Sequence, residues 1–499
     1  MIGKCALYAA ILLGSQFGVL CAQSSPKAAA SGATAARRKS TTTHSAPRDI
    51  SFVEAQPVLQ NFADDLPEDL KTVTSDHIPA IWPGYVRAHD SETRDRLLQG
   101  DEDSLINLLL FGTSFTHQPR LTDEFVTQAA HALSSRPQDH SGNDAAIRVL
   151  DARVEDMARA LTNPGANERI SYMRRLLEKR GLGFETPASR EKVRQYLIAG
   201  VARVRQEFQG YQKTIEAART TGDLDAEMAV RSTLFQKRGI SLDTSIMPDY
   251  ALEEALKLLL DHGLFAKKSI RRVAVVGPGL DFTDKQEGYD FYPQQTTQPF
   301  VLIDTLLRLG LSRKDDLQVT SLDISPRVNQ HLARIRQRAR QGSSYVVQFP
   351  LKSDRVWEPG AKAFWQHVGE FIGSPAAPVA TPPSVGKLDI QALKIPPEVV
   401  LSVSLKDLNV VWQRMDLPAA ERYDLVIATN ILVYYDEFQQ ALALDNLQSM
   451  IRQNGFLLTN NGLPEVPTLH MKQLGHSSTS YSEKAADGDH IIWYQHSTR

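Results

Sequence analysis

The chain has 499 residues, of which 42% are hydrophobic and 23% are charged, as in typical water-soluble globular proteins. This length allows about three domains. The formal net charge is -2, which gives no electrostatic reason to expect a nucleic acid as partner.

The N-terminus has the pattern of a secretory signal. Lys4 supplies a positive charge, and residues 5–20 after it are mostly apolar. A transmembrane anchor is the alternative, but Ser15 and Gln16 interrupt the apolar run, which is also short for a membrane span. We therefore expect residues 1–22 to be cleaved, the protein to be exported, and no stable membrane span to be left.

Both cysteines, Cys5 and Cys21, lie in this signal segment. The mature chain is then expected to have no disulfide and no cysteine metal site. The thirteen histidines show no spacing typical of a metal site either. Residues 23–50 are rich in alanine, serine and threonine without apolar periodicity, so they are predicted to form a disordered linker.

From 51 to 265 the apolar spacing is that of helices. Residues 191–220 form one long amphipathic pattern, and Thr186 with Pro187 is a good helix start. We interpret this region as an α-helical domain that serves as a scaffold or binds another protein, since its charged faces need no further role.

From 266 to 499 predicted strands alternate with predicted helices, which is typical of an α/β fold with a parallel sheet covered on both faces. An insertion near 349–397 interrupts the pattern, and the last two strands read as a hairpin. The expected architecture is a Rossmann-like sheet, mostly parallel with an antiparallel last strand, preceded by the α-helical domain. The strands are expected at 273–276, 317–322, 399–403, 409–413, 425–429, 456–459, 478–482 and 490–496.

A glycine loop follows the first predicted strand of this sheet. Gly277, Pro278 and Gly279 come directly after Val276. Glycine lets the backbone pass close to a ligand and adopt positive φ. Because ligands bind at the carboxyl ends of strands in open α/β sheets, this loop is a candidate binding element, although a lone Gly-x-Gly is weak evidence.

An acidic residue ends the next predicted strand. Asp323, with Ile324 beside it, is placed where a carboxylate can accept hydrogen bonds from ribose hydroxyls. The alternative role is a cap for the helix that begins at Pro326. Ser325 already suits that role, which leaves Asp323 for the ligand.

Two later segments add candidate residues. Met415 and Asp416 follow another predicted strand, and a carboxylate there can accept a bond from an adenine amino group; the alternative is a turn before Pro418. Asn430 and Ile431 follow a buried apolar strand, a position that favours contact with a ligand over packing.

The order of these motifs resembles that of class I S-adenosylmethionine-dependent methyltransferases, over about residues 269–499. The segment 430–435, Asn-Ile-Leu-Val-Tyr-Tyr, is similar to one in the chemotaxis-receptor glutamate methyltransferases. The resemblance implies S-adenosylmethionine as cofactor. It implies that the methionine end of the cofactor contacts Gly277, Pro278, Gly279 and Asp281, and that the ribose contacts Asp323 and Ile324. It also implies that the adenine contacts Met415 and Asp416, and that the sulfonium contacts Asn430 and Ile431.

The chain also departs from this family. An acidic residue usually stands two positions before the first glycine, where this chain has Val275. Without this acid, the amino group of the cofactor lacks a partner, and Asp281 could take the place of the acid. An insertion at 282–298 carries aromatic residues that either cover a substrate pocket or cover the sheet edge.

The sequence therefore predicts a methyltransferase that acts on a small molecule or a protein. The alternative is an exported, non-catalytic binding module with a degenerate methyltransferase fold, because the donor is not expected outside the cytoplasm. A Rossmann-type oxidoreductase is disfavoured by the terminal hairpin.

Overall fold

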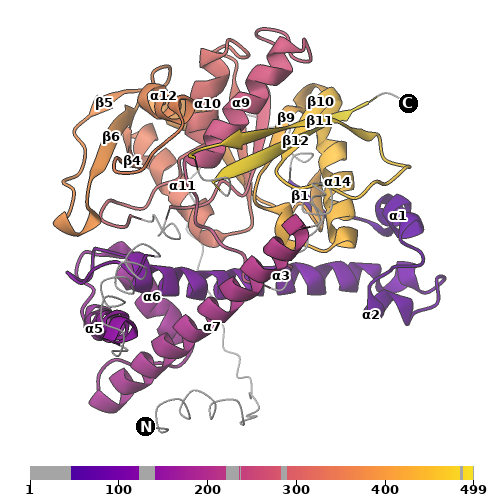
Figure 1. Cartoon of the computed structure of the whole chain (residues 1–499). Helices are drawn as coiled ribbons and strands as arrows, with labels where there is room; N and C mark the ends of the chain where they lie inside the picture. Colours follow the sequence, from indigo (N-terminus) through magenta and orange to yellow (C-terminus); the bar gives the residue numbers. More distant parts are fainter. Residues whose placement is uncertain are drawn as a thin grey trace, which may run out of the picture. The chain divides into compact units, whose positions relative to one another are not determined.

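The computed structural model describes residues 46–122, 141–220, 235–236, 238–281, 289–483 and 487–497 (Figure 1). The predicted signal segment and most of the predicted linker lie outside these residues. All of these described residues belong to one compact unit.

The predicted linker 23–50 ends in ordered structure. Strand β1 (Pro47–Asp49) pairs with β8 (Gln413–Met415) in a two-stranded antiparallel sheet. Ile50 follows it into the core, where its N–H donates to the carbonyl oxygen of Trp412 at 2.9 Å. Order therefore begins before residue 50, because this segment gains backbone partners far along the chain.

The main sheet has seven strands in the order β11-β12-β10-β9-β2-β3-β7. Strands β2, β3, β7, β9 and β10 run parallel, and β12 is antiparallel to both β10 and β11. The predicted α/β fold, with a mostly parallel sheet and an antiparallel last strand, is confirmed. The strand bounds are β2 (Arg272–Val276), β3 (Gln318–Asp323), β7 (Val403–Asp407), β9 (Tyr423–Ala428), β10 (Ile451–Thr459), β11 (Met471–Ser480) and β12 (Gly488–His496).

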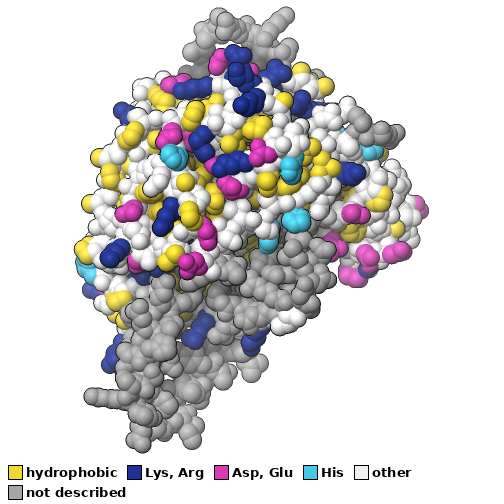
Figure 2. All heavy atoms as spheres, turned by 45° about the horizontal axis from the view of Figure 1, so that its top comes forward, with side chains coloured by type: hydrophobic (Ala, Val, Ile, Leu, Met, Phe, Trp, Pro, Cys, Tyr) yellow, Lys and Arg dark blue, Asp and Glu magenta, His cyan; other side chains and the backbone are white. Residues whose placement is uncertain are grey.

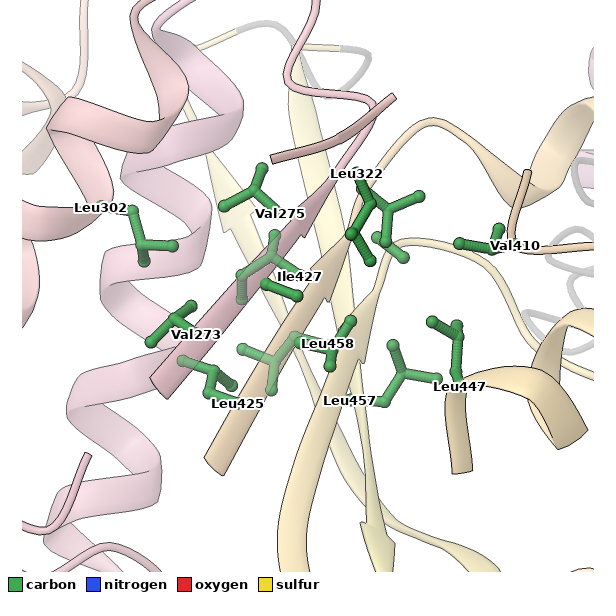
Figure 3. Packing of buried hydrophobic residues seen from close by; sticks show 14 of the residues in the cluster. Val273, Val275, Leu302, Leu322, Val410, Leu425, Ile427, Leu447, Leu457 and Leu458 are labelled. Atoms are coloured by element: carbon green, nitrogen blue, oxygen red, sulfur yellow. The ribbon is translucent and has the colours of Figure 1, made fainter. Parts of the chain in front are cut away.

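Helices cover both faces of this sheet, as continuous apolar strands require. In Figure 3, Leu302 of α10 lies on one side of the central strands and Leu447 of α14 on the other. Every residue of β9 is buried, which excludes water from the middle of the sheet. The covering helices are α9 (Met247–Asp261), α10 (Gln298–Arg308), α11 (Pro326–Arg340), α13 (Pro397–Ser402) and α14 (Glu437–Met450).

The segment before the sheet is helical, and it has two packing partners. The half of α3 around Trp82 packs into the core of the sheet, and the half around Leu105 packs with α5, α6 and α7 in a second core. The helices are α1 (Phe52–Asn61), α2 (Glu68–Lys71), α3 (Ile78–Phe111), α5 (Ser141–Thr162), α6 (Glu168–Lys179) and α7 (Pro187–Thr220).

The predicted insertion contains a small antiparallel sheet in the order β4-β6-β5, between α11 and α13. Its elements are β4 (Tyr345–Lys352), α12 (Pro359–His367), β5 (Ser374–Ala376), the 3-10 helix η1 (Pro383–Val385) and β6 (Leu388–Ile395). Two further 3-10 helices, η2 (Ala419–Glu421) and η3 (Leu432–Tyr434), flank β9.

Acidic and basic side chains are intermixed on the face shown in Figure 2. Among the described residues, no helix is long and apolar enough to cross a membrane.

Candidate functional site

A cavity of about 400 Å³ opens at the carboxyl-terminal edge of the parallel strands. Its walls come from the residues that follow β2, β3, β7, β9 and β10, and from the first residues of β12. This is the edge at which open α/β sheets bind ligands, and the volume suits a small organic molecule.

The glycine loop forms part of this wall. Gly277 and Gly279 line the cavity with φ of 60° and 73°, in the left-handed region that favours glycine. The N–H of Gly277 donates to the carbonyl oxygen of Leu322 at 2.8 Å, which ties the loop to β3. Pro278, between the two glycines, is not a lining residue.

Asp323 lies at the end of β3 and lines the cavity together with Ile324. Its Oδ1 accepts from the N–H of Ser325 at 2.7 Å. Its Oδ2 is buried and has no hydrogen-bond partner among the described residues. Burial raises the pKa of this carboxyl to about 7. Since buried polar atoms are nearly always satisfied, Oδ2 is suited to accept from a ligand hydroxyl.

Asn430 and Ile431 line the cavity directly after β9. Asn430 has φ of 59°, which asparagine tolerates better than most residues. Its N–H donates to Oδ1 of Asn460 at 2.7 Å, and Nδ2 of Asn460 donates back to its Oδ1. This reciprocal pair joins the ends of β9 and β10 and fixes the polar wall between them.

Met415 and Asp416, which were predicted to contact adenine, do not line the cavity. Met415 is buried in β8, opposite Pro47 of β1. The exposed carboxylate of Asp416 forms two hydrogen bonds with Arg48, of 2.5 and 2.6 Å. These bonds lower the pKa of Asp416, so the charge that was expected to meet a ligand already has a partner.

At the part of the cavity where the adenine contact was expected, the lining residues are Leu408, Asn409 and Val410, which were not predicted from the sequence. They directly follow β7, whereas strands were predicted at 399–403 and 409–413. Pro396 and Pro397 instead start helix α13, because proline suits a first helical turn, and the strand is displaced to Val403–Asp407. The signal in the sequence was the proline pair, because it moves the end of the strand to Asp407.

Asp281 does not reach the cavity either. It lines a separate pocket of about 60 Å³ and accepts from the hydroxyl of Tyr292 at 2.9 Å and from Nε2 of Gln295 at 3.1 Å. It also forms a β-bridge with Gln295. Asp281 was predicted to contact the methionine end of the cofactor, but its side chain is bonded beside residues 289–297 instead. Of the aromatic residues in the insertion at 282–298, Tyr289 and Tyr292 line this smaller pocket.

Residues N-terminal to the sheet supply a cover for the cavity that was not predicted from the sequence. The loop 240–245 and Leu97 of α3 line the cavity together with the strand ends. Arg96 of α3 donates to the carbonyl oxygen of Tyr434 at 2.7 Å and to that of Arg238 at 3.0 Å. Arg94 donates to the carbonyl oxygen of Ile324 at 3.2 Å. Two arginines of one helix thus hold the loops after β3 and β9.

The first residues of β12 complete the wall. Gly488, Asp489 and His490 line the cavity because β12 is antiparallel to β10, so its beginning lies at the carboxyl end of β10. Oδ2 of Asp489 accepts from the hydroxyl of Tyr481 at 2.5 Å. Within the described part of the chain, no group of histidine, cysteine, aspartate and glutamate residues could hold a metal ion.

No family model and no curated protein sequence match the chain. A comparison with solved structures finds methyltransferases at low identity. The N-methyltransferase NodS from Bradyrhizobium japonicum WM9 is 13% identical, with 50% of this chain and 98% of that chain covered and a TM-score of 0.24. The glycopeptide N-methyltransferase MtfA complexed with S-adenosyl-L-homocysteine is 11% identical, with 55% and 98% covered and a TM-score of 0.24. The selenomethionine-substituted carbon methyltransferase CurJ is 12% identical, with 89% and 99% covered and a TM-score of 0.23.

Proposed function

We propose that this chain binds S-adenosylmethionine in the cavity and transfers its methyl group to an acceptor. The observation that carries the proposal is the buried Oδ2 of Asp323, which lacks a partner and borders a cavity of about 400 Å³ beside a glycine loop. A ribose hydroxyl would satisfy this oxygen, and the left-handed glycines leave room for a ligand chain.

The cofactor's parts can be assigned along the strand ends. Leu408 and Val410 after β7 would hold the adenine, and Asp323 after β3 would hold the ribose. The glycine loop would face the methionine chain, and Asn430 after β9 would face the sulfonium. The strand order supports this assignment, because β7, β3, β2 and β9 are successive neighbours in the sheet.

When bound, S-adenosylmethionine supplies a methyl group on a positively charged sulfur, so the cofactor carries the reactive chemistry. The chain's contribution is to orient the two reactants and to exclude water. Segment 240–245 covers the cavity, and the Asn430–Asn460 pair fixes the wall at the methyl end.

The acceptor would enter on the side of Asn460, Asp489 and His490, where the wall is polar. A carboxylate acceptor, as the local similarity to chemotaxis-receptor methyltransferases implies, needs no base, whereas an amine or hydroxyl acceptor needs a proton acceptor. We propose a small molecule or a protein side chain as the acceptor.

Calorimetric titration of the purified protein with S-adenosylhomocysteine tests the proposal. We expect saturable binding that Asp323→Asn weakens and Asp416→Asn leaves unchanged. Absence of binding at millimolar ligand would contradict it.

A non-catalytic binding role is the second candidate, and Val275 favours it, because the acid of the related enzymes is missing there. Export of the chain would favour it as well. Mass spectrometry of acceptor mixtures incubated with S-adenosylmethionine and the protein separates the two, since any enzyme-dependent methylated product rejects the non-catalytic role. Sequencing of the mature N-terminus, with the cell fraction, tests the proposed export.

A further inference from the structure

The cavity lacks an acidic side chain on its glycine loop, where a cationic amino group would need a partner. Val275 is fully buried in β2, and the carboxylate of Asp281 is bonded to Tyr292 and Gln295 outside the cavity. If the proposed function is right, the α-ammonium of the cofactor's methionine end must find an acceptor elsewhere.

Gln298 is a polar side chain that is placed for this contact. It begins α10, the helix that follows the glycine loop in the crossover from β2 to β3, and it lines the cavity although only 6% of it is exposed. Its Nε2 donates to Oγ1 of Thr429 at 3.2 Å, at the end of β9. Since β9 is the neighbour of β2 on the side away from β3, Gln298 and Asp323 lie on opposite sides of the glycine loop.

The bond to Thr429 fixes how this amide is turned, because Nε2 is its donor. Oε1 is then the atom of the amide that can accept from a ligand. The amide also favours the ionised form of the carboxyl of Asp249 and so works against the rise that burial causes in its pKa. Among the described residues, no hydrogen bond to this Oε1 is found.

Asp249 stands behind this wall of the cavity. It lies in the first turn of α9, directly after Pro248, which lines the cavity. Its side chain is buried, and its Oδ2 has no hydrogen-bond partner among the described residues. Burial raises its pKa to about 8, and the amide of Gln298 works against this rise. A positive charge arriving at Gln298 would favour the ionised carboxylate further.

We propose that Oε1 of Gln298 accepts a hydrogen bond from the α-ammonium of the cofactor, in place of the acid missing at Val275, with Asp249 as the positioning residue behind it. The inference rests on the proposed function and adds to it a residue that selects ligands carrying the amino-acid chain. Asp323 and Gln298 then hold the two ends of one ligand across the glycine loop.

Comparing the binding of two ligands tests this contact separately from the rest of the site. S-adenosylhomocysteine carries the amino-acid chain, and 5′-methylthioadenosine has the same adenosine and sulfur without it. Gln298→Met keeps the side-chain length and removes both polar groups. We expect it to weaken S-adenosylhomocysteine binding about ten- to hundredfold, as for a lost hydrogen bond to a charged group, and to leave 5′-methylthioadenosine binding within about twofold. Gln298→Glu is expected to bind S-adenosylhomocysteine at least as tightly as the wild type, because it restores an acid.

The outcomes are distinct. An equal loss for both ligands in Gln298→Met, or no loss for either, overturns the inference while leaving the proposed function in place. Failure of the unmodified protein to bind either ligand rejects the proposed function itself. Melting curves of both variants identify a folding defect. Asp249→Asn, which keeps the shape of the carboxyl, is expected to weaken S-adenosylhomocysteine selectively but less than Gln298→Met.

Discussion

The side chain of Ile431 packs directly against the backbone of Gly277, so that a β-carbon at Gly277 would overlap its Cδ1. The two residues come from the ends of neighbouring strands, β2 and β9, and both line the cavity. The glycine therefore serves the close approach of these loops as well as its positive φ of 60°.

Gly277→Ala is expected to lower the free energy of unfolding by about 2 kcal/mol or more, because the new methyl group meets both the strained backbone and Ile431. Urea denaturation measures it. Gly210→Ala in α7 is the matched control, since nothing lies within 4 Å of the added carbon and alanine favours a helix. Equal stability of the two variants would contradict the packing argument.

Asp323→Asn is expected to weaken binding of S-adenosylhomocysteine about ten- to hundredfold, because the ribose loses a bond to a charged acceptor. Calorimetry measures the dissociation constant. Asn keeps the shape of the side chain and can still accept from Ser325, so the fold is expected to persist. An unchanged affinity would remove Asp323 from the site.

Asp416→Asn is expected to leave that affinity within about twofold, because the carboxylate binds Arg48 outside the cavity. The stability change should be at most about 1 kcal/mol, as for exposed ion pairs, since Arg48 keeps its bonds to Glu54. Leu408→Ala, measured alongside, is expected to weaken binding. The reverse pattern would restore the adenine contact that the sequence alone suggested.

The free energy of unfolding is expected to fall as the pH rises from about 4 to about 8 through two buried carboxyls. Burial raises the pKa of Asp323 to about 7 and that of Asp249 to about 8, above their ordinary value of 3.8. In this window the folded chain binds more protons than the unfolded chain, so raising the pH favours unfolding. The stability that these groups contribute is complete below their unfolded pKa and is lost as the pH passes the folded values.

Urea denaturation at about pH 5 and about pH 8 measures this dependence. Asp249→Asn and Asp323→Asn should each reduce the difference between the two conditions. The exposed Asp315→Asn serves as the control and should not. Identical pH profiles for all four proteins would show that the two buried carboxyls do not titrate in this window.

Arg96→Lys is expected to loosen the cover over the cavity. Lysine keeps the charge but loses the planar fork that binds the carbonyl oxygens of Tyr434 and Arg238 at once. Hydrogen exchange at segment 240–245 should speed up, while exchange in β9 stays unchanged. Equal exchange in the variant and the wild type would mean that Arg96 does not hold the cover.

Much of the sheet, but only part of the site, could be predicted from the sequence. Apolar runs with helices between them predicted the parallel strands, and the late hairpin predicted the antiparallel β12, because both signals are local. Six predicted residues line the cavity, and they are Gly277, Gly279, Asp323, Ile324, Asn430 and Ile431.

The remaining predictions depended on pairings that no local pattern contains. Asp416 was predicted to contact adenine. Instead it pairs with Arg48, which is far away in sequence and is brought close by the β1–β8 sheet. The position of Asp281 depends on the direction in which the chain leaves the glycine loop. Leu408 was not predicted, because α13 displaces the end of the strand before it. The cover by α3 and segment 240–245 arises from tertiary packing, which apolar periodicity alone cannot predict.

A crystal structure of the protein with S-adenosylhomocysteine tests the central claim most directly. We expect the ligand in the cavity at the strand ends, with a ribose hydroxyl on Oδ2 of Asp323 and the adenine against Leu408 and Val410. A ligand bound beside Asp416, or a cavity that stays empty at saturating ligand with Asp323 facing water, would contradict it.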